Sequence, residues 1–106
     1  MKIIIVGAGE VGSHLAKLLS KENQDVILVD SNESKLSNLD SYNLMTFVGS
    51  PTSFKTLKSV NIDQADLFIA VTPYETQNIS ACSMAHWLGA KYTVARIDNY
   101  EYLKSQ

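Results

Sequence analysis

The chain has 106 residues, of which 45% are hydrophobic and 19% are charged, and its formal net charge is -2 at pH 7. This composition predicts one globular domain over residues 1–106 and argues against a disordered chain. Its eight lysines and single arginine are scattered along the sequence, so no basic stripe is available to hold the phosphate backbone of a nucleic acid.

The cysteine content and the distribution of apolar residues indicate where the protein works. Cys82 is the only cysteine, which excludes a disulfide within the chain and is typical of a reducing compartment. No apolar run approaches the roughly 18 residues that cross a bilayer. Gly7 and Gly9 interrupt the apolar start before any cleavage pattern of a signal peptide. We therefore expect a cytoplasmic protein that does not insert into a membrane.

Short apolar runs alternate with longer mixed segments from the start of the chain to its end. The apolar runs predict buried strands at residues 3–6, 26–29, 44–48, 67–71 and 92–96. The mixed segments predict helices at residues 9–21, 53–59, 75–88 and 99–104. In the first of these helices, the apolar spacing predicts an inward face made of Val11, Leu15, Leu18 and Leu19.

A further helix is expected between the second and third strands. Asp30, Ser31 and Asn32 can cap it, and Leu36 and Leu39 would face inward. Gly89 is expected to stop the helix of residues 75–88. Five strand–helix repeats predict an α/β fold: a Rossmann-like, doubly wound parallel sheet of at least five strands, flanked by helices through right-handed crossovers.

The sequence Gly7-Ala8-Gly9-Glu10-Val11-Gly12 follows a predicted strand and opens a predicted helix, which is the context of a phosphate-binding loop. In such a loop the first glycine permits the tight turn, the second admits a pyrophosphate, and the third lets the helix pack against the sheet. Backbone amides and the helix dipole then attract the anion without a basic side chain. Glu10 is expected to face solvent. The alternative is a glycine-rich turn without a ligand.

Asp30 ends the second predicted strand, 18 residues after Gly12, near the position of the acid that binds the adenosine ribose in dinucleotide-binding folds. A carboxylate there would repel a 2′-phosphate, and Lys35 is a poor substitute for an arginine clamp. The residues thus favour NAD(H) over NADP(H), with Ser31 beside the acid. The alternative for Asp30 is a helix cap only.

Ligands of open α/β sheets bind outside the carboxyl ends of the strands, where the strand order reverses. This rule adds Gly49-Ser50, Thr72-Pro73 and Arg96 to the candidate positions. Pro73 would force an extended turn that exposes carbonyl groups. Arg96 would reach a phosphate or a neighbouring subunit, or it is a solvated arginine at the sheet edge.

No convincing catalytic grouping occurs in the sequence. Cys82 and His86 are four residues apart on one helix, which resembles half of a metal site, but no second ligand pair accompanies them. We expect neither a metal ion nor enzymatic activity. The rival hypothesis is the cofactor-binding half of an NAD-dependent dehydrogenase that lacks its catalytic domain.

Several motifs resemble the RCK or KTN family, the nucleotide-binding domains that regulate potassium transport and include the N-terminal domains of TrkA-type subunits of bacterial Trk uptake systems. The resemblance spans essentially the whole chain. Its motifs are residues 1–12, Val29-Asp30, residues 65–72, Asn78 with Ala81-Cys82, and Ala95-Arg96-Ile97.

The resemblance implies a regulatory domain that binds NAD or NADH, or ATP or ADP in some members, and controls a membrane potassium-translocating subunit from the cytoplasmic face. It places the ligand at residues 7–11, Asp30, Thr72-Pro73 and Arg96. It also implies a homo-oligomer, either a dimer or a tetrameric ring, and further structure after residue 106 that includes a sixth strand. The fifth strand would otherwise be an exposed edge that favours pairing with another copy.

Two positions depart from the family pattern. Many members have Gly-Asp where this chain has Gly49-Ser50, and Pro73-Tyr74-Glu75 replaces a more polar run. These departures affect the adenosine contact and the hydrogen bonding on the nicotinamide side.

Overall fold

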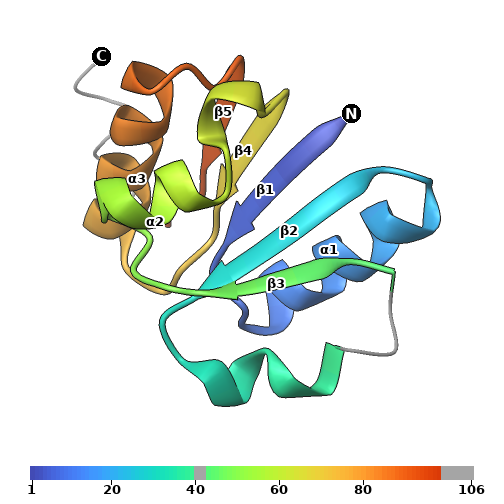
Figure 1. The fold of residues 1–106 in the computed structure, drawn as a ribbon. Helices are drawn as coiled ribbons and strands as arrows, with labels where there is room; N and C mark the ends of the chain where they lie inside the picture. Colours follow the sequence, from blue (N-terminus) through green and yellow to red (C-terminus); the bar gives the residue numbers. More distant parts are fainter. Residues whose placement is uncertain (40–42, 99–106) are drawn as a thin grey trace.

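The structure, a computed structural model, describes residues 1–39 and 43–98. It contains a five-stranded sheet in the order β3-β2-β1-β4-β5, and all neighbouring strands are parallel (Figure 1). The strands are β1 (Lys2–Val6), β2 (Asp25–Asp30), β3 (Met45–Val48), β4 (Leu67–Ala70) and β5 (Tyr92–Ala95). The predicted α/β fold with a parallel sheet is confirmed.

The burial of the central strand β1 explains why the strands appear in the sequence as continuous apolar runs. It lies between β2 and β4, and Ile4 is in register with Ile27 on one side and with Phe68 on the other. Residues 3–6 are at most 2% exposed. A strand that is covered on both faces needs apolar side chains at every position, so no alternation appears.

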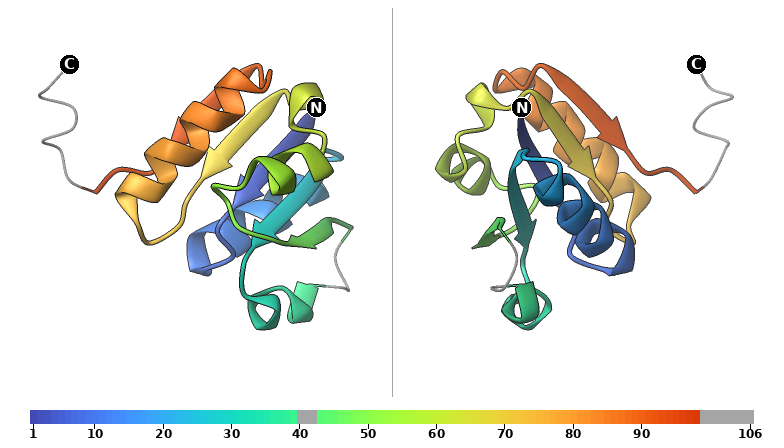
Figure 2. Two further views of the ribbon diagram at one scale, coloured as in Figure 1. Left: turned by 60° about the vertical axis from the view of Figure 1, so that its left-hand side comes forward. Right: turned by 90° about the vertical axis from the view of Figure 1, so that its right-hand side faces the viewer.

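Helices cover both faces of the sheet, as expected for a doubly wound fold. They are α1 (Glu10–Lys21), α2 (Phe54–Ser59) and α3 (Glu75–Trp87), with the 3₁₀ turns η1 (Glu33–Lys35), η2 (Ser37–Leu39) and η3 (Ile62–Gln64). In the right-hand view of Figure 2, α1 and α2 lie on opposite sides of β2. One core cluster joins Ile4 to Leu57 and Ala81 beneath α2 and α3, and the other joins Ile5 to Ala16 beneath α1.

The strand order reverses at β1. The chain builds β2 and β3 on one side of β1 and then crosses to β4 and β5 on the other side. The carboxyl ends of β1, β2 and β4 therefore meet at one edge of the sheet (Figure 1). This edge is where a ligand binds in an open α/β fold.

The predicted inward face of the first helix is wrong in two positions. Val11 and Leu18 are 48% and 47% exposed, whereas the buried residues of α1 are Gly12, Ala16 and Ser20. Small side chains let the helix axis approach the sheet closely, so the contact stripe runs through them. Leu15 and Leu19 pack at the margin of this stripe.

The helix predicted after β2 is replaced by η1 and η2. Asn32 rather than Asp30 caps η1, because its Oδ1 accepts hydrogen bonds from the backbone nitrogen and the hydroxyl of Ser34. The Ser37 hydroxyl donates to the carbonyl of Ser34. Such local bonds compete with a continuous helical ladder. Leu36 and Leu39 are each 3% exposed, as the sequence predicts.

The other predicted elements are confirmed with small shifts of their ends. Ser53 caps α2, and Gly89 adopts φ 111° after α3. The amides of Gly89 and Ala90 donate to the carbonyls of His86 and Ala85, which completes a Schellman motif. Strands β4 and β5 end one residue earlier than predicted. The helix predicted at residues 99–104 lies outside the described residues.

The stripe of small residues on α1 generates a stability test. Replacing the fully buried Ala16 with leucine overpacks the helix–sheet contact and is expected to lower the free energy of unfolding by about 1–3 kcal/mol. The control Leu18→Gln alters a half-exposed position of the same helix and is expected to change the free energy of unfolding by less than about 1 kcal/mol. Urea denaturation of both variants measures the difference. Equal losses would contradict the placement of this face.

Candidate functional site

Three segments converge at the carboxyl edge of the sheet: the glycine loop after β1, the end of β2 and the loop after β4. A cavity of about 100 Å³ lies there, lined by Asp30, Ser31, Lys35, Pro51, Thr72, Pro73, Tyr74 and Gln77. The structure thus brings together four of the predicted site residues, Asp30, Ser31, Thr72 and Pro73. A hydrogen bond from the Ala8 nitrogen to Asp30 joins the glycine loop to this cavity wall.

The three glycines of the loop serve different steric purposes. A Cβ on Gly12 would collide with the carbonyl of Gly7. Helix α1 can therefore approach the end of β1 this closely only because residue 12 has no side chain. Gly7 has φ 106°, and a Cβ on it would lie 2.8 Å from the Thr72 nitrogen. Apart from its two chain neighbours, no residue in the described part of the chain has an atom within 4 Å of a Cβ built on Gly9. Gly9 therefore borders open space that a ligand could use.

Helix α1 begins beside this open space without a side-chain cap. Gly9 is the N-cap residue, and its carbonyl accepts the first helical bond from the Ser13 nitrogen. The side chains of Glu10 and Val11 are exposed, as predicted for Glu10. Uncapped first-turn amides and the positive end of the helix dipole favour an anion at this point.

Asp30 is 9% exposed and holds two turns together. Its Oδ2 accepts a hydrogen bond from the Ala8 nitrogen at 2.8 Å, and its Oδ1 accepts one from the Asn32 nitrogen at 2.8 Å. The helix-cap alternative for Asp30 is therefore wrong, since Asn32 is the cap. Each carboxylate oxygen retains a further lone pair, which a ribose hydroxyl could use.

Thr72 is 6% exposed, and its polar groups are occupied within the protein. Its nitrogen and its hydroxyl both donate to Oδ1 of Asn78, at 2.9 and 2.7 Å. The Thr72 carbonyl accepts from Nδ2 of Asn78, and the Tyr74 carbonyl lies within 3.2 Å of the Thr72 hydroxyl. The carbonyls on either side of Pro73 are thus hydrogen-bonded within the protein, and the exposure of carbonyls at this turn stays a prediction for Pro73 itself.

Arg96 does not line the cavity. Its Nε lies 3.3 Å from Oδ1 of Asp98, and the two side chains are 41% and 60% exposed. Gly49 and Ser50 do not line the cavity either. The Gly49 nitrogen donates to the Asp30 carbonyl, and a Cβ on Gly49 would press on Thr56. Sequence reasoning missed Pro51, Tyr74 and Gln77. Only the tertiary structure brings the loop after β3 and the start of α3 to the cavity.

The Cys82–His86 pair lies away from this edge, in a groove of about 500 Å³ between α3 and β5. Burial raises the pKa of the Cys82 thiol to about 11. A neutral buried thiol is a poor nucleophile. Within residues 1–39 and 43–98, no group of three or more His, Cys, Asp or Glu side chains is placed to hold a metal ion.

The arrangement of strands and loops at the carboxyl edge is that of a Rossmann-like fold. The structure superimposes on the NAD(P)-binding domain of an exopolyphosphatase-related protein from Archaeoglobus fulgidus, with a TM-score of 0.85 and 16% identity over 97% of this chain and 77% of that chain. It also resembles the Kef C-terminal domain from Shewanella denitrificans in its AMP-bound form, with a TM-score of 0.80 and 21% identity over 99% of this chain and 67% of that chain.

Residues 3–105 match the TrkA-N domain family, and the chain belongs to that family. It is 43% identical to the Trk system potassium uptake protein TrkA of Haemophilus influenzae over the whole of this chain and 24% of that protein. It is 35% identical to a TrkA homologue of Archaeoglobus fulgidus over 97% of this chain and 23% of that protein. The chain thus spans about a quarter of the length of these relatives. No helix in the described part of the chain is long and apolar enough to cross a membrane.

The different surroundings of Gly12 and Gly9 predict losses of stability of different size for the same substitution. Gly12→Ala forces α1 away from β1 and is expected to lower the free energy of unfolding by about 2 kcal/mol or more. Gly9→Ala meets open space and is expected to cost no more than about 1 kcal/mol, the difference between glycine and alanine at an N-cap. Chemical denaturation compares the two variants. A stable Gly12→Ala protein would contradict the close approach of α1.

Proposed function

We propose that this chain is a regulatory domain that binds NAD or NADH at the carboxyl edge of its sheet. The observation that carries the proposal is the open space at Gly9. Gly9 is the N-cap of α1, which has no side-chain cap, and the preceding residue, Ala8, donates a hydrogen bond to the buried Asp30 carboxylate. On this proposal, the amides at the start of α1 would hold an anion and Asp30 would accept from a ribose at the same edge of the sheet. The alternative of a glycine turn without a ligand does not explain why this space is left open.

Each part of the edge would hold a different part of the dinucleotide. The amides of Glu10 and Val11 would donate to the pyrophosphate, and Gly9 would admit it because no side chain intervenes. Asp30 would accept hydrogen bonds from the ribose hydroxyls on its remaining lone pairs. Ser31, Thr72 and Pro73 would shape the wall of the cavity. Arg96 would contact the ligand only after leaving its ion pair with Asp98.

The same edge offers a site for ATP or ADP, because these nucleotides carry the same ribose and a chain of phosphates. The Kef domain of similar fold is recorded with AMP. A 2′-phosphate would meet the Asp30 carboxylate. Lys35, which lines the cavity, is an exposed and flexible counter-charge. We therefore place NAD(H) ahead of NADP(H).

The relatives named potassium uptake proteins support a role in controlling ion uptake. We propose that the domain acts at the cytoplasmic face of the membrane, on a potassium-translocating subunit of the Trk type. A ligand shifts a conformational equilibrium only by its difference in affinity for the two states. The nucleotide would accordingly bind one arrangement of a dimer or tetrameric ring more tightly, and no chemical conversion is required.

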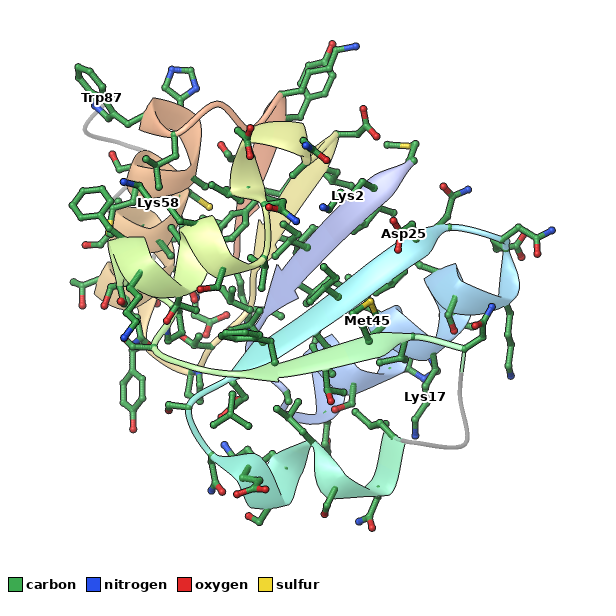
Figure 3. All side chains as sticks on the ribbon, viewed as in Figure 1. Lys2, Lys17, Asp25, Met45, Lys58 and Trp87 are labelled. Carbon is green, nitrogen blue, oxygen red and sulfur yellow. The ribbon has the colours of Figure 1, made fainter. Side chains whose placement is uncertain are left out.

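An oligomer has surface available to it on α3 and β5. Trp87 is 84% exposed and projects from the end of α3 (Figure 3). Tyr92 and Val94 of β5 are 62% and 52% exposed. Exposed apolar groups of this kind support contact with another protein surface.

Calorimetric titration with NADH, NAD, ATP and ADP tests the binding proposal. We expect saturable binding of NAD or NADH to the unaltered chain, and at least roughly tenfold weaker binding to Gly9→Ala, because its Cβ takes space that the pyrophosphate needs. Leu18→Gln, which changes an exposed side chain farther along the same helix, is the matched control and should bind within about twofold of the unaltered chain.

Failure of all four nucleotides to bind would contradict the proposed function. Oxidation of NADH with a panel of carbonyl substrates would instead support the dehydrogenase hypothesis.

The preference for NADH over NADPH is expected to depend on the Asp30 charge. Asp30→Asn removes the charge but keeps one oxygen acceptor for the two turns, so it perturbs the loop less than Asp30→Ala would. We expect the ratio of NADH to NADPH affinity to fall by about tenfold, measured by calorimetry at one ionic strength. An unchanged ratio in a folded variant would remove Asp30 from the ribose position.

A further inference from the structure

Asn78, in the first turn of α3, is buried more completely than any predicted polar site residue, with 1% of its surface exposed. Its side-chain amide forms four hydrogen bonds. Oδ1 accepts from the nitrogen and the hydroxyl of Thr72, and Nδ2 donates to the carbonyls of Thr72 and Arg96 at 3.0 and 3.1 Å. Two donors and two lone pairs are all that an amide side chain possesses, so its capacity is used completely.

These bonds lie where β4 and β5 stop pairing. The Arg96 nitrogen still donates to the Ala70 carbonyl, but both strands have ended by Thr72 and Arg96. Beyond this last backbone bond, the Asn78 side-chain amide replaces the strand-to-strand hydrogen bonds and links the two strand ends. A buried polar group is costly unless it is bonded. Asn78 therefore determines the geometry of both strand ends in addition to filling space.

The two ends that Asn78 joins have different surroundings. Thr72 lines the cavity with Asp30, whereas Arg96 does not line it and begins the segment by which the chain leaves β5, where it pairs with Asp98. The side chain of Asn78 thus forms a continuous hydrogen-bonded connection between Thr72 in the cavity wall and the Arg96 carbonyl.

We propose that Asn78 is a positioning residue that couples occupancy of the nucleotide cavity to the path of the chain beyond β5. The proposal rests on the proposed function, because it concerns how binding at that edge is transmitted. The ligand presses on or orders the Thr72–Tyr74 wall, the amide moves with it, and the Arg96 carbonyl follows. The transmitted signal is a change in direction of the exit segment of residues 96–98.

Amide chemical shifts measured by NMR during titration with NADH test this coupling. In the unaltered chain, saturation is expected to shift the amides of Glu10 and Val11, those of Thr72 and Tyr74, and those of Arg96 and Ile97. In Asn78→Ala, the shifts at Arg96 and Ile97 are expected to fall by roughly threefold or more, while those at the glycine loop remain at saturating ligand.

Two further variants separate coupling from general damage. Asn78→Asp keeps the oxygen that accepts from Thr72 but, when ionised, has no donor for the Arg96 carbonyl, so it should also lose the distant shifts. The matched control Ser80→Ala changes an exposed side chain of the same helix and should retain them. A merely structural role for Asn78 would lower stability or affinity without changing the ratio of distant to local shifts.

Each remaining outcome decides against the proposal. Shifts at Arg96 that persist at full size in the Asn78 variants would mean that NADH reaches Arg96 directly, or that the signal takes another route. Shifts at the glycine loop without any at Arg96 and Ile97 in the unaltered chain would overturn the coupling and leave the proposed function intact. An absence of shifts everywhere, with NADH, NAD, ATP and ADP alike, would overturn both.

Discussion

The start of α1 lies so close to the end of β1 that residue 12 can only be glycine. A side chain there would occupy the position of the Gly7 carbonyl, and one at Gly7 would press on the backbone at Val71 and Thr72. This steric constraint places the amino end of a helix directly above the central strand. The close contact between α1 and β1 therefore fixes where the helix dipole and the open space at Gly9 lie relative to the ends of β2 and β4.

Two buried polar side chains then fix the walls on either side of this contact. Asp30 links the glycine loop to the turn after β2, and Asn78 links the loop after β4 to the end of β5. Both bind backbone groups that the sheet ladder no longer satisfies. Polar groups that are buried with all their partners make an edge rigid, because any displacement leaves a donor or acceptor unpaired. The hydrogen bonds that hold the candidate site in place are thus the same bonds that would carry a structural change from a bound ligand to the end of β5.

Membership of the TrkA-N family and the geometry of the edge support one interpretation from different directions. The family match rests on residues distributed over nearly the whole chain, whereas the geometry rests on three loops. The residues that line the cavity include Pro51 and Gln77, which belong to no recognisable motif. A motif identifies the backbone part of such a site well, because glycine spacing is a strict requirement. It identifies the side-chain walls poorly, because many residue types can form them.

The sequence by itself determined the five strands, the helices that follow β1, β3 and β4, the glycine loop and the acid at the end of β2. Continuous apolar runs and glycines at required spacings are local signals, so they can be recognised from neighbouring residues in the sequence alone. Only the tertiary structure decided that Ala16 rather than Val11 faces the sheet, that Arg96 lies outside the cavity wall, and that Asn78 joins two strand ends. Each of these depends on how closely distant segments approach one another, and packing distance is not encoded in the periodicity of a single segment.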